Sequence, residues 1–439
     1  MSDRALTRGV VGVLLIAWVG ALMPVRVLAS GFALNEESGK LMGMAFAGTA
    51  ALADDATSGY YNVAGLTRIK QGSFSGTVTG YLLNLDFHAT SSTVFGQPVS
   101  GSTDADPTRN TAVPAFHAAW RLADRWVIGL GVTVPFGLEI KYPADSVVRY
   151  VATKSELLTY NINPAIAYRI NEQWSVGAGF NAQYAQAKLE QKVAIPVPMA
   201  PDGDILVKPD DWAFGANCGI LYEPTSDMRF GVNYRSQISY SLGGGATVRN
   251  VPLFKSGRMT ADLTLPDSVT ASALIGILPN LQLLGDLSWT HWSVFHELQA
   301  MFNNGLPDLT IPEDFRDTWR ASLGFNYDIT DAWAVRMGGA FDQSPVTNST
   351  RTVRIPDSNR WLLGLGAGYH LTKSLIVDLG YLHIFFDGGT VNETAQVLGA
   401  PNVQGIYTNG TGDLIALQVT YNFDHVFEFY DQLRERFRG

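Results

Sequence analysis

The sequence predicts an all-β fold: a fourteen-stranded antiparallel transmembrane β-barrel with an N-terminal hatch plugging its lumen. Three observations predict it. Segments alternate bulky apolar residues with small or polar ones, short polar turns lie between aromatic residues, and the number of such segments is even. Forty-four glycines and 11% aromatic residues indicate β-structure with many turns, and no apolar run beyond the N-terminus is long enough for a transmembrane helix.

The first element, residues 1–29, is predicted to be a secretory signal peptide. Two arginines precede an apolar run of about 15 residues, and small residues form a cleavage site that ends at Ala29. The alternative, a membrane-anchor helix, needs roughly 20 apolar residues. Cleavage would export the mature chain, residues 30–439, from the cytoplasm.

Charge and cysteine content exclude several classes of protein. The net charge is −9, and removing the signal peptide takes away three arginines and one aspartate, which leaves about −11. An acidic chain has no basic field for nucleic acid, so no nucleic-acid partner is expected. The single cysteine, Cys218, cannot form an intramolecular disulfide. No cofactor and no metal site are expected either.

Membrane strands are predicted from a period of two. In residues 126–137 (WVIGLGVTVPFG) the bulky residues fall on one face: Trp126, Ile128, Leu130, Val132, Val134 and Phe136. The same pattern recurs in residues 174–184 and 319–328. A soluble sandwich also alternates, but its polar face meets water. Here the opposite face is reduced to glycine, serine and asparagine, as expected for lipid outside and a hollow lumen inside.

Aromatic residues enclose the short turns: Trp120 and Trp126, Tyr168 and Trp174, Tyr327 and Trp333. Aromatic rings favour the headgroup level of a membrane, so we interpret this placement as an interfacial girdle. Ordinary aromatic strand residues are the alternative, but they do not explain the common position beside the turns.

The barrel is predicted over residues 71–423. Its strands are expected near 72–88, 110–122, 125–139, 153–170, 172–190, 211–223, 227–242, 264–278, 280–296, 315–328, 332–344, 359–371, 374–388 and 411–423. Long loops are expected outside the cell near 89–109, 140–152, 191–210, 243–263, 297–314, 345–358 and 389–410. The short turns would face the periplasm.

The hatch is predicted over residues 30–70. Barrels of about eight strands are filled by their own side chains, whereas those of about 16 to 18 strands leave channels, so a fourteen-stranded lumen needs an occupant. The many small residues of this segment would let turns and short helices pack against a wall of glycines.

Several motifs resemble the FadL/TodX family of outer-membrane transporters of hydrophobic compounds. They are SGFALNE (30–36), AFAG (45–48), ADDA (53–56), YNVAGL (61–66), VPFGL (134–138), Arg149-Tyr150 and NPAIAY (163–168). The resemblance covers essentially the whole mature chain. It implies uptake of long-chain fatty acids or related compounds by capture at extracellular loops, binding in the lumen and release when the hatch shifts.

Two other functions stay open. One is an uptake channel of the same family for aromatic hydrocarbons or alkanes, and the other is a general porin, although a porin needs no plug. An enzyme is not expected, because the chain has no Gly-x-Ser-x-Gly, HExxH or CxxC motif. The partners expected are a hydrophobic small molecule, outer-membrane lipid and lipopolysaccharide. The protein is expected to be a monomer.

The resemblance assigns hatch roles to individual residues. The family motif Asn-Pro-Ala maps to Asn62, Val63 and Ala64, with valine at the proline position. An extra N–H and a freer φ should loosen or re-bond this turn. Asn62 is expected either to cap a backbone group or simply to form a turn. Phe32 and Leu34 are expected at the inner pocket.

Two long loops carry apolar residues, which are costly in water unless they cover or bind something. By resemblance these loops would form the first capture groove, through Ile195, Val197, Met199, Leu253 and Phe254. The alternative is that they pack on each other as a lid.

Cations in the lumen could bind a carboxylated cargo through charge-assisted hydrogen bonds. Alternation places Arg235, Arg320 and Arg336 on the lumen face. Three aspartates on these strands and their neighbours also face inward, so a structural charge network is the alternative.

Two further features are predicted, one within the third strand and one after the last strand. Pro135 and Gly137 interrupt the third strand, and proline inside a strand marks an edge or a bulge, so we expect a kink that opens the wall for lateral exit of cargo. Residues 424–439 follow the last strand and are expected to form a short amphipathic helix.

Overall fold

The structure, a computed structural model, describes residues 31–197, 200–252, 254–305, 308–394, 401–408 and 410–423. The predicted signal peptide and the predicted C-terminal helix lie outside the described residues, as do Met199 and Leu253. None of the helices in the described ranges has the length and apolar character needed to cross a bilayer.

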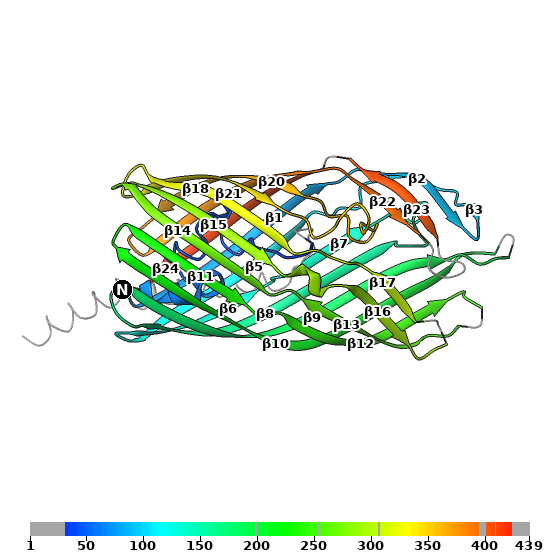
Figure 1. Cartoon of the computed structure of the whole chain (residues 1–439), viewed down its shortest axis with the longest axis horizontal. Helices are drawn as coiled ribbons and strands as arrows, with labels where there is room; N and C mark the ends of the chain where they lie inside the picture. The colour runs from blue at the N-terminus through cyan, green and yellow to red at the C-terminus, as the bar shows by residue number, and fades with distance from the viewer. Residues whose placement is uncertain are drawn as a thin grey trace, which may run out of the picture.

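Antiparallel strands close into a barrel, and the prediction of fourteen wall strands is confirmed (Figure 1). The first strand, β1, pairs with β5 on one side and with the last strand, β24, on the other, which closes the wall. The wall consists of β1 (Gly72–Asn84), β5 (Thr111–Ala123), β6 (Trp126–Thr133) with β7 (Gly137–Lys141), β8 (Lys154–Arg169), β9 (Trp174–Val193), β10 (Gly203–Thr225), β11 (Met228–Arg235) with β12 (Ile238–Arg249), β13 (Gly257–Leu265) with β14 (Ser268–Leu278), β15 (Leu281–Thr290), β18 (Thr318–Asp328), β19 (Trp333–Asp342), β20 (Arg360–His370), β21 (Leu375–Phe386) and β24 (Thr411–Asn422). The short strands β16 (Glu297–Phe302) and β17 (Leu309–Pro312) extend the wall above β15 and β18.

The alternation of side chains places apolar residues outside and small polar ones inside. On β9, Ser175, Asn181 and Gln183 face inward and are buried, while Trp174 and Phe180 face outward and are exposed. Because lipid surrounds such a wall, its exposed apolar residues need no further cover.

The predicted outward face of residues 126–137 is correct up to Val132 and wrong for Val134 and Phe136. Val134 is 3% exposed and Phe136 is 8% exposed, whereas Val132 is 41% exposed. The ladder of β6 ends at Thr133, and the chain then leaves the plane of the wall before β7 begins. The period of two applies only while the strand continues.

Aromatic rings beside the short turns contact one another across neighbouring strands. The ring centroids of Trp174 and Tyr222 are 4.3 Å apart, and those of Trp333 and Tyr369 are 4.4 Å apart. These rings are exposed or partly exposed on the outer wall, which is where an interfacial girdle belongs.

The loops predicted near 191–210 and 243–263 are shorter than expected, because the strands on either side continue into these ranges. The strand β9 continues to Val193, and β10 spans 23 residues from Gly203. A membrane-spanning strand needs only about 9–11 residues, so these hairpins extend beyond the bilayer. At the same end lies a separate five-stranded sheet formed by β2 (Phe87–Val94), β3 (Gln97–Pro98), β4 (Asp104–Ala105), β22 (Gly389–Glu393) and β23 (Asn402–Tyr407) (Figure 1).

The N-terminal segment, residues 31–71, lies inside the barrel in the half where the short turns are found (Figure 1). It contains α2 (Gly39–Met42), α3 (Ser58–Tyr61) and a 3-10 helix, η1 (Val63–Arg68). Its side chains are nearly all buried, and Met42, Met44 and Ala45 are fully enclosed.

Glycines of the wall let the backbone of this segment approach closely. Gly324, Gly338 and Gly364 lie in register on β18, β19 and β20, and a Cβ on Gly338 would overlap the Met44 carbonyl. Across the lumen, a Cβ on Gly231 of β11 would overlap the Ala50 carbonyl oxygen. The N-terminal segment is therefore seated on the wall by direct backbone contact on two sides.

The variant Gly231→Ala tests whether this seat keeps the lumen closed. The added methyl group overlaps Ala50, and relieving such overpacking costs on the order of 1–3 kcal/mol, so the N-terminal segment should shift. Single-channel recordings in planar bilayers should then show a higher basal ion conductance than the wild type. The control is Gly243→Ala on β12, where an added Cβ meets nothing within 4 Å. Equal, low conductance in both variants would contradict the plugging role.

Candidate functional site

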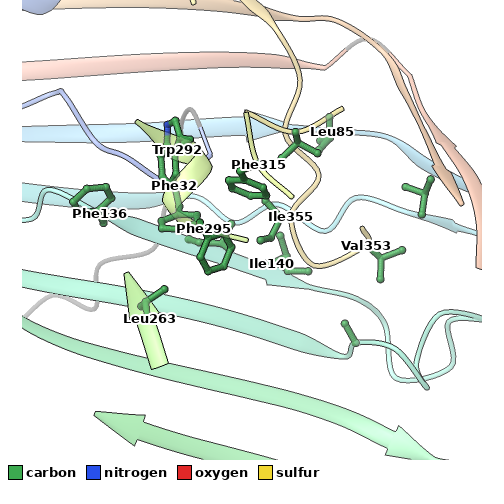
Figure 2. Close-up of a cluster of buried hydrophobic side chains, with 14 of the residues drawn as sticks. Phe32, Leu85, Phe136, Ile140, Leu263, Trp292, Phe295, Phe315, Val353 and Ile355 are labelled. Atoms are coloured by element: carbon green, nitrogen blue, oxygen red, sulfur yellow. The ribbon is translucent and has the colours of Figure 1, made fainter. Parts of the chain in front are cut away.

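Five aromatic rings, one of them from the N-terminal segment, meet inside the barrel (Figure 2). The ring centroid of Phe32 lies 4.8 Å from that of Trp292 and 5.7 Å from that of Phe295, both in edge-to-face geometry. Phe136 and Phe315 complete this aromatic cluster. Rings in such arrangements hold each other beyond their burial alone, so the cluster forms a defined apolar wall.

A cavity lies between this aromatic cluster and the inner face of the barrel. It encloses about 830 Å³ outside protein atoms, including its part open to solvent. One side is apolar and is formed by Leu34, Pro135, Phe136 and Trp292. The other side is hydroxyl-rich and carries two cations. It includes Thr49, Asn233, Arg235, Ser268, Thr270, Ser288, Thr290, Thr318 and Arg320, together with one carboxylate, Asp342.

Arg235 reaches this cavity from β11. Its Nη1 donates to Asn181 Oδ1 at 2.9 Å, and its Nη2 donates to the Tyr60 carbonyl at 3.2 Å. The guanidinium also stacks 4.4 Å from the centroid of the Tyr60 ring. Neutral groups thus orient the cation, and no carboxylate in the described part of the chain forms an ion pair with it.

Arg320 reaches the same cavity from β18. It lies 5.2 Å from the centroid of the Phe46 ring, and its Nε has no hydrogen-bond partner among the described residues. Two nearby carboxylates are engaged elsewhere: Asp286 accepts from the Thr49 N–H at 2.8 Å, and Asp342 forms an ion pair with Arg360 at 2.8 Å. A second cation therefore faces the cavity with unused donors.

Arg336 faces inward as alternation predicts but has a structural partner. Its Nη1 lies 2.7 Å from Asp378 Oδ1, its Nε donates to Asn326, and both members of the ion pair are almost fully buried. It does not line the cavity. The structure thus brings together Arg235 and Arg320 and separates Arg336 from them.

The hatch motif is anchored by its asparagine. Asn62 Oδ1 accepts from the Ala64 N–H at 3.1 Å and caps η1, while its Nδ2 donates to the carbonyls of Ala50 and Ile220. Asn62 is therefore a cap as well as a turn residue. Val63 begins η1, where the first N–H groups have no partner within the helix, so valine can replace proline without breaking a helical bond.

The predicted interruption of the third strand is present. The β6–β8 ladder ends at Thr133, the β7–β8 ladder begins at Gly137, and residues 134–136 lie between them. The N-terminal segment meets this break, because the Leu34 N–H donates to the Pro135 carbonyl at 2.8 Å and the Gly137 N–H donates to the Phe32 carbonyl at 2.9 Å. The wall break thus adjoins the aromatic cluster and the cavity.

The proposed capture residues lie on two neighbouring hairpin tips. The strand β10 pairs with β9 up to Gly203 and Val193 and with β12 up to Asp204 and Arg249, so the ends of the two hairpins are adjacent. Val197 is exposed, and Ile195 and Phe254 are partly exposed. Their partners Met199 and Leu253 lie outside the described residues.

Residues 343–359, which we call the cap, connect β19 to β20, and residues 351–358 are buried. Arg354 donates to Ser155 Oγ at 2.8 Å and to Gln191 Oε1 at 2.7 Å. Burial lowers the pKa of Arg354 to about 10, although the charges of Glu393 and Glu313 oppose this shift. Burial likewise raises the pKa of both glutamates.

Sequence reasoning missed most of the aromatic cluster. Trp292, Phe295 and Phe315 lie in segments predicted to be strands, 280–296 and 315–328, and none carries a motif. Tyr60, which supports Arg235, was also missed. Contacts between segments this far apart in sequence leave no periodic signal, although the ending of the alternation near residue 290 marks the place where the chain leaves the wall.

Comparison with known proteins is consistent along the whole chain. The model of the family described as outer membrane protein transport protein (OMPP1/FadL/TodX) matches residues 20–423. The "Long-chain fatty acid transport protein" of Salmonella typhi is 32% identical over 405 residues, which cover 85% of this chain and 91% of the relative. "Outer membrane protein P1" of Haemophilus influenzae is 29% identical over 441 residues, covering 90% and 95%.

Solved structures share the fold. A FadL homologue of Pseudomonas aeruginosa superposes with a TM-score of 0.82 at 23% identity, covering 90% of this chain and all of that one. The toluene transporter TodX of Pseudomonas putida superposes with a TM-score of 0.68 at 15% identity, covering 90% and 100%.

The family match and the closed barrel together settle the class of the protein. It is an outer-membrane protein, and the family consists of transporters and channels and not of enzymes. The chain belongs to the OMPP1/FadL/TodX family of outer-membrane transport proteins.

Proposed function

We propose that this transporter takes up long-chain fatty acids and holds the carboxylate between Arg235 and Arg320, with the tail against the aromatic cluster. The observation that carries the proposal is the cavity itself. Two guanidinium groups that form no ion pair among the described residues face a space that also has an apolar side, and Asp342, the acidic residue in the lining, is paired with Arg360. This arrangement suits an amphiphile with an anionic head.

Uncharged hydrocarbons are the second candidate cargo, because a structural neighbour is named a toluene transporter. Such a molecule would use the aromatic cluster but would leave both arginines without an anion. A general porin is disfavoured, because the buried N-terminal segment and the buried cap occupy the lumen. The two cations, which form no ion pair among the described residues, therefore favour the fatty acid.

The proposed path has three stages. Cargo first contacts Ile195, Val197, Phe254 and their neighbours at the hairpin tips, then passes the cap and enters the cavity beside Phe32. The N-terminal segment acts as the hatch and is held by Asn62, Val63 and Ala64. Release is lateral, through the break at Pro135 and Gly137, so that the apolar tail passes into lipid and avoids water.

We also propose that one chain is the transporting unit. Each element of the path is supplied by the same barrel, and the exposed apolar residues of the wall would contact outer-membrane lipid and lipopolysaccharide. Neither a cofactor nor a metal ion has a role in this mechanism.

Replacing both cavity arginines tests the position of the carboxylate. In Arg235→Met/Arg320→Met we expect oleate affinity to fall at least tenfold, because a hydrogen bond to a charged group contributes about 1.5–3 kcal/mol. Affinity for oleyl alcohol should change little. Isothermal titration with purified protein measures both, and Arg258→Met on the exposed part of β13 is the control. An equal loss of affinity for oleate and for oleyl alcohol would contradict a carboxylate site at these two arginines.

Uptake itself is tested in bacteria that lack their own fatty-acid transporter. Cells that express this protein should take up labelled oleate faster than cells with the empty vector, after outer-membrane assembly is verified. Labelled toluene is the parallel cargo. Acceleration of toluene uptake alone would replace the fatty acid by an uncharged hydrocarbon.

Opening of the cap should increase with pH. Burial raises the pKa of Glu313 well above its usual range, with Glu393 acting in the same direction and Arg354 opposing it. Protonated Glu313 therefore stabilises the closed cap. This contribution is complete below the ordinary carboxyl pKa and is lost as the pH rises through the raised pKa.

Hydrogen exchange of residues 351–358, compared between about pH 5 and about pH 9 after correction for intrinsic exchange, measures the effect. Glu313→Gln should flatten the pH dependence of opening, and Glu297→Gln at an exposed position of β16 should not. Identical profiles for wild type and Glu313→Gln would refute the assignment.

A further inference from the structure

The wall is interrupted between β5 and the third strand. The β5–β6 ladder ends with the pair Phe116 and Val132. Beyond it, residues 111–115 of β5 continue to pair with β1, while β7 pairs with β8. Two strand edges thus face each other over several residues without a ladder between them.

Pro114 lies on the β5 edge of this interruption. The Arg121 N–H of β5 donates to the Gln71 carbonyl on the β1 side. Because N–H directions alternate along a strand, the even-numbered residues direct theirs toward the third strand. Proline has no N–H, so residue 114 cannot supply the next bond after Phe116.

The opposite edge also carries a proline, one residue beyond the expected partner of Pro114. Continuing the register of Phe116 and Val132 by two residues would place Pro114 against Val134, and Pro135 follows directly. Pro114 removes one of the two hydrogen bonds that its pair with Val134 would form, and the ladder stops at this pair, as is usual where a strand carries proline.

The N-terminal segment replaces β5 as the partner of the break. The Leu34 N–H donates to the Pro135 carbonyl, the Phe32 carbonyl accepts from the Gly137 N–H, and Ala33 forms an isolated antiparallel bridge with Phe136. We call residues 32–34 the arm. Phe136 itself is held by β8, because its N–H donates to Thr159 Oγ1 at 3.0 Å and its carbonyl accepts from the Thr159 N–H at 3.1 Å.

We infer that Pro114 is a positioning residue that keeps the wall from closing between β5 and β7, and that the arm is the exchangeable partner of that edge. The inference rests on the proposed lateral release. Phe32 belongs both to the arm and to the aromatic cluster.

The test restores the missing donor. Pro114→Val supplies an N–H and a strand-favouring side chain, so the β5 edge can pair with the third strand. We expect labelled oleate uptake in cells to fall several-fold, while oleate binding to the purified protein stays unchanged. The matched control is Pro164→Val on β8, where Ile162 and Ala165, which flank the pair Asn163 and Pro164, already pair with β9.

Cross-linking reports closure directly. Thr111 and Gly137 would face each other if the β5–β6 register continued, so Thr111→Cys/Gly137→Cys is made in a Cys218→Ser background. Disulfide yield after oxidation should be low with Pro114 present and several-fold higher with Pro114→Val. Heat-modified migration on gels verifies that each variant is a folded barrel, and Pro114→Ala is the second variant if the valine variant does not assemble.

The outcomes separate the two proposals. Normal uptake and unchanged disulfide yield in a folded Pro114 variant would overturn the role of Pro114. Equal loss of uptake in the Pro114 and Pro164 variants would also overturn it, because the effect would then be general to strand prolines. Failure of the wild type to take up either oleate or toluene would instead overturn the proposed function.

Discussion

Pairing of backbone N–H and C=O groups is the constraint on which this molecule depends. Unpaired groups at membrane depth cost several kcal/mol each, and a closed antiparallel barrel removes the edges where they would occur. The third strand is the informative exception. Its ladder stops for residues 134–136, and the bonds there are supplied by Thr159 of β8 and by the N-terminal segment. The ladder can be interrupted here because another part of the chain satisfies these groups.

Inside the lumen, small side chains and backbone contacts determine where the N-terminal segment lies. Glycines of β18, β19 and β20 leave room for the backbone at Met44 and Ala45, and Asn62 fixes the opposite side through three hydrogen bonds to backbone groups. Contacts of this kind specify position closely while burying little apolar area. Space is left above the N-terminal segment for a cavity that has both rings and cations around it.

The wall could be predicted from sequence because a strand has a fixed period. Alternation identified the strands and placed Arg235, Arg320 and Arg336 inside correctly. It could not distinguish them, because pairing of Arg336 with Asp378 depends on which strands are neighbours. It failed at Val134 and Phe136, where the period itself ends. Phe32, Trp292 and Phe315 meet only after the barrel has closed, so no local sequence pattern predicts their cluster.

Closure of the barrel by β1 and β24 sets an order of assembly. Ser73 pairs with Asn422, so the first wall strand finds one of its two neighbours only when nearly the whole chain has been made. Gln418 of β24 also bonds Ser38 and Asp55 of the N-terminal segment. The final strand therefore completes both the wall and the contacts that hold the N-terminal segment. Pairing over so long a stretch of chain is slow, and the unfinished barrel exposes both a free edge and an apolar outer face. Such an intermediate has to be protected from aggregation until its last strand arrives.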